Sequence, residues 1–285
     1  MNRFMANNPI GKLYERIRPH IPLIYLPILV SPIILLAPVW AKGEVLFWGT
    51  PYLQFVPWKE LAWQTLRSGH LPLWNPMVGM GAPLLANYQS ALIYPATWFL
   101  LLLSALGGVQ WMAWGQIVFV MFHMVWAGTG MALLVKRLGF NALAQVVAGI
   151  SFELCGYLVA RSGFLSINAA AAWLPWVMLA GYGLAVSKTV FKIKNVIPLT
   201  FCMGMQLLAG HAQTTYYTIL LLFPWMIFWG WRQAGWKNGL TACALLALAG
   251  FMAAAVTAVQ LLPTLEYLLQ SQRAGSVGYV DAMNY

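Results

Sequence analysis

The chain has 285 residues, of which 61% are hydrophobic and 8% charged, and its formal net charge is +10. Soluble globular domains carry about 25% charged residues, so this composition excludes an ordinary soluble protein and favours a membrane protein. Apolar runs of about 20 residues, enough to cross a bilayer as a helix, recur along the sequence. The basic residues lie between these runs, where they set topology and meet anionic lipid head groups. The lipid bilayer is therefore the expected partner, and nucleic acid is not.

Residues 1–20 are a short basic segment, and residues 21–40 are the first expected span. The apolar stretch is too long for the 7–15-residue core of a signal peptide, and Trp40 lies inside the would-be cleavage motif. We therefore expect an uncleaved first helix. Its prolines agree with this interpretation, because membrane helices tolerate proline better than soluble helices do.

Residues 43–108 hold many of the polar and turn-forming side chains, and we expect them to form one extracytoplasmic loop. Residues 51–68 predict an amphipathic helix, with Pro51 in its first turn and Gly69 as its C-terminal cap. Its apolar face would carry Phe55, Trp58, Ala62 and Leu66, and its polar face Glu60, Gln64 and Arg67. Such a helix would lie along the membrane interface.

The apolar run at residues 90–106 contains Pro95 and ends at Gly107 and Gly108. If it does not span and the N-terminus is cytoplasmic, eleven of the 16 Lys and Arg residues are cytoplasmic and five are outside. If it spans, the split becomes six inside and ten outside. The positive-inside rule therefore predicts a juxtamembrane or re-entrant helix on the outer face.

The resulting fold class is an all-α, polytopic membrane protein with about seven spans and a single membrane domain over residues 1–285. The expected spans are residues 21–40, 109–135, 141–160, 168–187, 195–211, 214–231 and 238–262. No charged cytoplasmic tail follows the last span, so we expect the chain to be truncated, with further spans beyond Tyr285.

Signatures of several enzyme classes are absent from the sequence. It has no P-loop, no complete Gly-x-Gly-x-x-Gly motif, no Gly-x-Ser-x-Gly elbow and no histidine pair at i and i+4. The three cysteines stand singly in apolar runs, which is typical of small buried side chains rather than of disulfides or zinc ligands. The residues therefore predict no metal site and identify no cofactor.

Ionisable and polar residues suggest two candidate sites. Glu153 lies inside an expected span, where an ionisable group is a functional candidate. The alternative is a structural role, as the partner of Arg161, two turns later, or of a polar group on another helix. In the expected topology, polar groups from four separated segments meet at the outer face, as a site for a lipid-linked substrate would require. These groups are Glu44, Glu60, His70, Asn75, Asn87, Gln89, Arg161, His211, Gln213 and Glu266. The alternative is that outer loops are polar because they are wet.

Several stretches spread over about residues 45–275 resemble the YfhO-type bacterial membrane proteins. They are Gly-His-Leu-Pro-Leu-Trp-Asn-Pro at 69–76, Gly-Ala-Pro-Leu-Leu-Ala-Asn-Tyr-Gln-Ser at 81–90, Tyr94-Pro95, Lys-Arg-Leu-Gly at 136–139, Ala-Trp-Leu-Pro-Trp at 172–176, Ala-Gly-His-Ala-Gln at 209–213, and Leu262-Pro263 with Glu266 and Ser271. That family resembles the GT-C superfamily of membrane glycosyltransferases, which use polyprenyl-phosphate sugars. Their first external loop carries juxtamembrane helices and an acidic catalytic residue.

The resemblance implies a glycosyltransferase of the bacterial cytoplasmic membrane that moves a sugar from a polyprenyl-phosphate donor to an extracytoplasmic glycan or lipid acceptor. The sequence departs from the family pattern at Thr50, where that pattern has an acidic residue, although Gln54 matches the pattern. Threonine cannot replace a carboxylate as a base or metal ligand. Either Glu60 or Glu44 then acts as the acid/base, or the protein is inactive.

The same resemblance implies roles for other residues and leaves alternatives open. Arg67, Arg161 and His211 are candidate phosphate contacts, and the candidate sugar contacts are Trp74, Asn75, Asn87 and Gln89. It also allows a divalent cation as cofactor. The alternative functions are a non-enzymatic transporter or flippase of a lipid-linked substrate, with Glu153 as its coupling residue, and a structural assembly partner.

Overall fold

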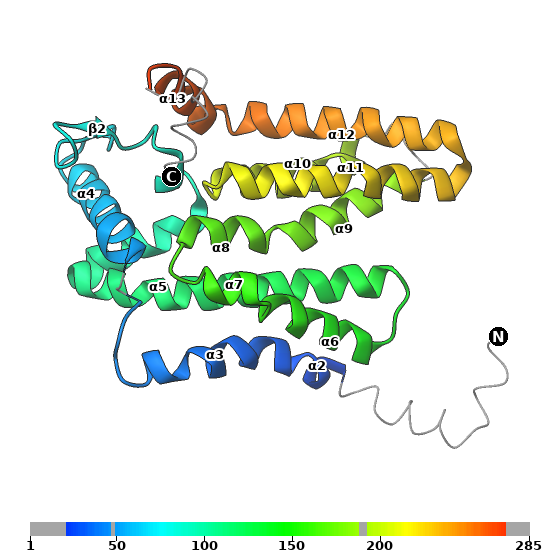
Figure 1. The fold of residues 1–285 in the computed structure, drawn as a ribbon, viewed down its shortest axis with the longest axis horizontal. Coiled ribbons are helices and arrows are strands. Elements are labelled where there is room, and N and C mark those ends of the chain that lie inside the picture. Colours follow the sequence, from blue (N-terminus) through cyan, green and yellow to red (C-terminus); the bar gives the residue numbers. More distant parts are fainter. Residues whose placement is uncertain (1–20, 47–48, 188–192, 272–285) are drawn as a thin grey trace, which may run out of the picture.

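The computed structural model describes residues 21–46, 49–187 and 193–271, which form an almost entirely helical bundle (Figure 1). The helices in chain order are α2 (Ile21–Ile24), α3 (Leu26–Trp40), the π-helical turn η2 (Pro51–Phe55), α4 (Val56–Arg67), the 3-10 turn η3 (Tyr88–Ser90), α5 (Pro95–Arg137), α6 (Ala142–Glu153), α7 (Gly156–Ala160), α8 (Leu165–Ala172), α9 (Leu174–Ala185), the 3-10 turn η4 (Ile193–Asn195), α10 (Ile197–Leu208), α11 (Ala212–Ala234), α12 (Trp236–Val256) and α13 (Ala258–Leu269). Within these ranges the strands are a short antiparallel pair, β1 (Trp74–Asn75) and β2 (Ala82–Pro83).

Four helices of the described residues are long and apolar enough to cross a membrane. They are Pro95–Arg137, Ala142–Ala160, Leu165–Ala185 and Trp236–Val256. The chain is therefore a helical membrane protein, as its composition predicts, but the expected seven spans are not confirmed. α3 has 15 residues, and α10 and α13 have 12 each. At 1.5 Å per residue, 12 residues extend about 18 Å, well short of the roughly 30 Å hydrocarbon core.

Helix α5 is interrupted where the sequence predicts a boundary. Gly107 (φ −140°, ψ 16°) and Gly108 (φ 71°, ψ −167°) leave helical geometry and separate residues 95–106 from the long remainder. Gly108 adopts a positive φ that residues with a Cβ rarely occupy. The first part is about 18 Å long, too short to cross a bilayer by itself. Its re-entrant position relative to a membrane stays a prediction.

The amphipathic helix after Pro51 is confirmed. η2 and α4 together cover residues 51–67, and Gly69 follows with φ +82°. Phe55 and Ala62 on the predicted apolar face are buried, whereas Leu66 is exposed. The helix packs its buried face against the bundle because those positions repeat every three to four residues.

The long helices run between two ends of the bundle (Figure 1), and these ends carry different residues. We call the end that carries α4, β1–β2 and α13 the loop end; it comprises residues 43–46 and 49–94, the turns at 161–164 and 209–211, and α13. The opposite end, here the basic end, carries Lys136, Arg137, Lys194, Arg232 and Lys237. The basic segment at 1–20, Lys188, Lys192 and Arg273 lie outside the described residues.

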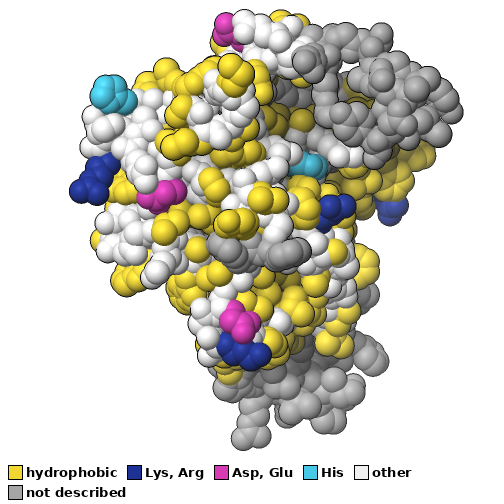
Figure 2. Space-filling view, turned by 60° about the vertical axis from the view of Figure 1, so that its left-hand side comes forward, with side chains coloured by type: hydrophobic (Ala, Val, Ile, Leu, Met, Phe, Trp, Pro, Cys, Tyr) yellow, Lys and Arg dark blue, Asp and Glu magenta, His cyan; other side chains and the backbone are white. Residues whose placement is uncertain are grey.

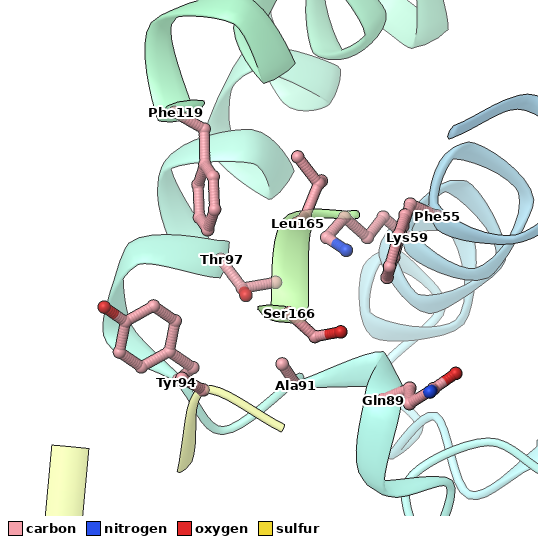
Figure 3. A pocket seen from close by; sticks show the side chains of 10 residues that line it. Phe55, Lys59, Gln89, Ala91, Tyr94, Thr97, Phe119, Leu165 and Ser166 are labelled. Carbon is pink, nitrogen blue, oxygen red and sulfur yellow. The ribbon is translucent and has the colours of Figure 1, made fainter. Parts of the chain in front are cut away.

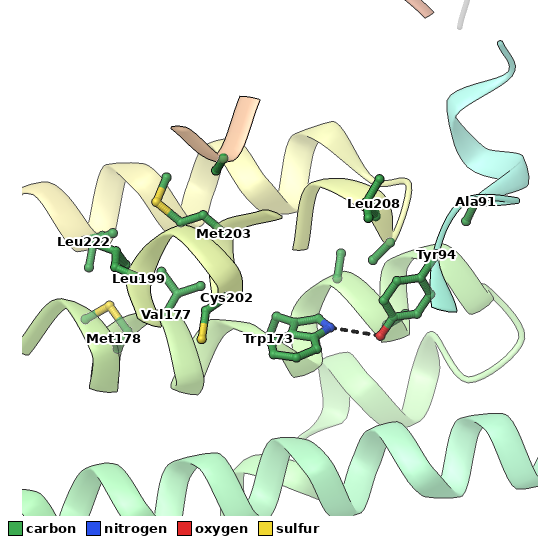
Figure 4. Close-up of a cluster of buried hydrophobic side chains, with 14 of the residues drawn as sticks. Ala91, Tyr94, Trp173, Val177, Met178, Leu199, Cys202, Met203, Leu208 and Leu222 are labelled. Atoms are coloured by element: carbon green, nitrogen blue, oxygen red, sulfur yellow. Dashed lines mark hydrogen bonds between the residues drawn. The ribbon is translucent and has the colours of Figure 1, made fainter. Parts of the chain in front are cut away.

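Two features hold the described helices together. The main apolar cluster joins α5, α8, α9, α10 and α12, and part of it is drawn in Figure 4. Glycines allow close approach of α5 and α6, because a Cβ on Gly149 would lie 2.9 Å from the backbone oxygen of Gly128. Small residues at such contacts are typical of membrane helix pairs. The three cysteines are free thiols.

Candidate functional site

Segments far apart in the sequence are joined at the loop end. The Tyr88 hydroxyl donates to the backbone oxygen of Leu207 (2.5 Å), at the end of α10. From α13, the amide of Gln260 donates to the backbone oxygen of Leu85 (2.9 Å). A Cβ on Gly163 would lie only 3.8 Å from Pro51, so the 161–164 turn packs on the start of η2. The residues around 85–91 are thus fixed by both α10 and α13.

Two of the predicted sugar contacts, Asn75 and Asn87, shape the loop itself. The Oδ1 atom of buried Asn75 accepts from the backbone N–H of Met77 (2.9 Å). The Oδ1 atom of Asn87 accepts from the backbone N–H of Gln89 (3.2 Å) and caps η3. Both side chains therefore stabilise turns, as asparagine commonly does.

The two candidate acids have different surroundings. Glu60 is half-buried and holds α4 to the first part of α5, because Ser104 donates to its Oε2 (2.6 Å) while Gln64 donates to its Oε1 (3.0 Å). Glu44 is exposed just after α3. Neither lines the pocket described below.

Of the predicted phosphate contacts, the structure brings Arg161 and His211 together. His211 caps α11, with its Nδ1 accepting from the backbone N–H of Thr214 (3.2 Å). Burial lowers the pKa of His211, and the positive charge of Arg161 lowers it further. The guanidinium of exposed Arg161 lies 5.2 Å from the ring centroid of Phe164. His211 is therefore favoured as a neutral imidazole beside a cation.

The remaining predicted contacts do not share one pocket among the described residues. Arg67, His70, Trp74, Gln213 and Glu266 are all exposed. On the face of the molecule drawn in Figure 2, the visible charged and histidine side chains are scattered and do not form one patch. The structure therefore supports a smaller site than the sequence predicts.

Of the two structural partners predicted for Glu153, Arg161 is wrong, and a polar group on another helix is confirmed. Glu153 is buried on α6, and its Oε1 accepts a hydrogen bond from Ser31 of α3. Its other oxygen, Oε2, has no hydrogen-bond partner within the described part of the chain. The actual partner lies 122 residues away in the sequence, and only the packing of α3 on α6 brings it close.

Sequence reasoning missed Lys59, which is 2% exposed. Its Nζ lies 4.8 Å from the ring centroid of Phe55, one turn earlier on the same helix face. No carboxylate pairs with it among the residues that the structure describes. Burial lowers its pKa to about 7. The available signal was its spacing, because a residue four after Phe55 and three before Ala62 belongs to their buried face.

Lys59 extends into a small pocket between α4, the start of α5 and α8 (Figure 3). The polar side chains lining it besides Lys59 and Tyr94 are Gln89, Thr97 and Ser166. None of these three has a side-chain hydrogen bond with another described residue. The cavity volume of about 10 Å³ is roughly what one water molecule needs.

Tyr94 lines the pocket, but its hydroxyl belongs to a separate buried network. Trp173 donates to the Tyr94 oxygen through Nε1 (2.9 Å; Figure 4), and that oxygen lies 2.8 Å from His123 Nε2. His123 Nδ1 lies 2.7 Å from the backbone oxygen of Phe119. Because that carbonyl can only accept, Nδ1 carries the proton, and the Tyr94 hydroxyl donates to Nε2. Each of these polar atoms has a hydrogen-bond partner, so we assign the network a structural role and no catalytic one.

The described residues contain no group of three His, Cys, Asp or Glu side chains that could hold a metal ion, and we assign no ligand to a divalent cation. Comparisons with models of protein families, with curated proteins and with solved structures find no match to this chain.

Proposed function

We propose that this chain is a GT-C-like glycosyltransferase of the bacterial cytoplasmic membrane, which transfers a sugar from a polyprenyl-phosphate donor to an extracytoplasmic glycan or lipid acceptor. The observation that supports the proposal is the joining of residues 85–91 to α10 and α13 at one end of an apolar bundle. A donor with a hydrocarbon tail and a polar head needs such a place, where apolar helices end and polar turns begin. The YfhO-type stretches at 81–90 and 209–213 contribute to this junction.

The proposed orientation follows from charge. The positive-inside rule assigns the basic end to the cytoplasm, so the loop end faces the outside and the N-terminus is cytoplasmic. Five described basic residues lie at the basic end: Lys136, Arg137, Lys194, Arg232 and Lys237.

In the proposed reaction, a carboxylate removes a proton from the acceptor hydroxyl as its oxygen attacks the anomeric carbon. The bond from that carbon to the donor phosphate breaks, and the phosphate leaves with the electron pair. Glu60 or Glu44 is the proposed base. Arg161 and neutral His211 would stabilise the leaving phosphate by charge and hydrogen bonding.

Glu60→Gln and Glu44→Gln test this function in proteoliposomes that contain a radiolabelled polyprenyl-phosphate sugar. At position 60 glutamine can still bond to both Ser104 and Gln64, so the change removes charge with little effect on packing. Loss of the true base should lower the release of polyprenyl phosphate by about 100-fold or more, while Lys237→Gln at the basic end should not. Wild-type rates in both glutamate variants would contradict the proposed bases.

The buried Glu153 favours a second candidate function, the non-enzymatic transport of a lipid-linked substrate. An ionisable group inside a membrane helix is costly and commonly marks a proton or substrate pathway, and its Oε2 lacks a partner among the described residues. Under this alternative, Glu153→Gln abolishes movement of a fluorescent lipid-linked sugar between leaflets, whereas the changes at Glu60 and Glu44 do not. Normal movement with Glu153→Gln would exclude it as the coupling residue.

A further inference from the structure

We propose that the pocket around Lys59 is an oxyanion subsite, which receives one oxygen atom of a phosphate group. The inference rests on the proposed function only for the lipid-linked nature of the ligand. That the pocket binds a phosphate group is inferred from the residues that line it.

A buried cation requires compensation. An ammonium group without an opposite charge is expensive in a low-dielectric site, so it loses its proton or acquires an anion. Lys59 has no such partner among the described residues, and the ring face of Phe55 compensates only in part. At neutral pH the amine is therefore poised to take up a proton when an anion arrives, because its pKa is lowered to about 7 by burial.

The rest of the pocket supplies further hydrogen-bond donors. Ser166 comes from α8, Thr97 from the first part of α5, and Gln89 from η3. Figure 3 shows the Lys59 nitrogen lying between Phe55, Leu165 and Ser166. The hydroxyls of Ser166 and Thr97 and the amine of Lys59 thus line one space from three separate elements. The amide of Gln89 lies at its exposed mouth, and none of these groups has a side-chain hydrogen-bond partner among the described residues. Lys59, Thr97 and Ser166 are buried, and packing alone would not require three unpaired polar groups there.

The size of the pocket determines how a ligand would bind. A cavity volume of about 10 Å³ admits one oxygen atom and excludes a whole phosphate. The phosphorus atom and the remaining oxygens therefore lie at the mouth, where Gln89 is exposed. The pocket is also lined by Ala209 and Leu165, which are close in sequence to His211 and Arg161. These two residues are thus on the turns that flank the pocket, where they can meet the outer oxygens.

The test uses the full chain in uncharged phosphatidylcholine nanodiscs, with dodecyl phosphate and inorganic phosphate as probes in binding calorimetry. Lys59→Met should weaken the binding of dodecyl phosphate at least 10-fold, and Ser166→Ala several-fold. Lys42→Met, which changes an exposed lysine directly before the loop end, should have no effect. The affinity of the wild type for dodecyl phosphate should fall up to 10-fold per pH unit above the pKa that Lys59 has in the protein without ligand, because the ammonium fraction falls. Tyr94 is the other titratable residue lining the pocket, and its hydroxyl is engaged with His123 and Trp173.

The outcomes separate the possible ligands and the two proposals. Binding of dodecyl phosphate without inorganic phosphate indicates a lipid-linked ligand, and equal affinity for the two indicates a free phosphate. Unchanged affinity in Lys59→Met, or no binding of either probe by the wild type, overturns the subsite. Lys59→Met should retain the thermal stability of the wild type, because methionine removes the cost of burying an amine. If phosphate binding depends on Lys59 while both glutamate variants transfer sugar normally, the subsite stands and the proposed bases fail.

Discussion

The close approach of α5 and α6 makes a quantitative prediction for Gly149→Ala. A Cβ at this position would lie 2.9 Å from the backbone oxygen of Gly128 and 2.8 Å from Cδ1 of Ile28. The isoleucine side chain can rotate, but the backbone oxygen can move only if the two helices separate. The substitution should therefore destabilise the fold although alanine is the better helix former.

The expected size follows from two opposing effects. Overpacking costs about 1–3 kcal/mol, and replacing glycine by alanine inside a helix contributes about 1 kcal/mol of stabilisation. We expect a net loss of up to about 2 kcal/mol. Gly183→Ala in α9 is the matched control, because nothing lies within 4 Å of its added Cβ. It should be neutral or stabilise the protein by up to about 1 kcal/mol.

The assay is unfolding of the purified variants in mixed micelles with increasing dodecyl sulfate, followed by circular dichroism. Gly149→Ala should unfold at a lower detergent fraction than the wild type, and Gly183→Ala at an equal or higher one. If Gly149→Ala is at least as stable as Gly183→Ala, the reasoning from the close backbone contact is refuted.

Two further predictions concern the loop end and the network beside it. Burial and the charge of Arg161 lower the pKa of His211 in the folded state. The contribution of neutral His211 to the free energy of unfolding is therefore complete above about pH 6.5 and is lost as the pH falls. Melting temperatures between pH 5 and 8 should therefore show a weaker acid dependence in His211→Asn, which can still cap α11; an unchanged slope would contradict this. Tyr94→Phe removes the hydroxyl that joins His123 to Trp173. Each buried atom left unpaired costs about 1–3 kcal/mol, so this variant should have a lower melting temperature than the wild type. A melting temperature equal to that of the wild type would mean that another group replaces this hydroxyl.

Features determined by local backbone chemistry could be predicted from the sequence. Pro51 and Gly69 correctly delimit the amphipathic region, because proline favours a first helical turn and glycine a left-handed cap. The Gly107–Gly108 pair correctly indicates the interruption in α5. Each of these signals lies within a few residues of the structure that it encodes.

Features that depend on distant contacts could not be predicted in the same way. The break at Thr257 between α12 and α13 has no glycine or proline at that residue, so the predicted span runs across it. A polar group on another helix is among the predicted partners of Glu153, but its identity as Ser31 could not be predicted, because 122 residues separate the two. Lys59 could be assigned to a buried helix face, but its pocket requires Ser166, which only the packing of α8 provides.

The interruption at Gly107 and Gly108 also has a mechanical consequence. The short helix before it carries Thr97 and Ser104 on the same face, seven residues apart, and Ser104 is bonded to Glu60 on α4. The wall of the Lys59 pocket and the candidate base at position 60 therefore belong to one unit, hinged to the long membrane helix at two glycines. A displacement of that unit towards or away from α8 would change the width of the pocket and the position of Glu60 in a single movement.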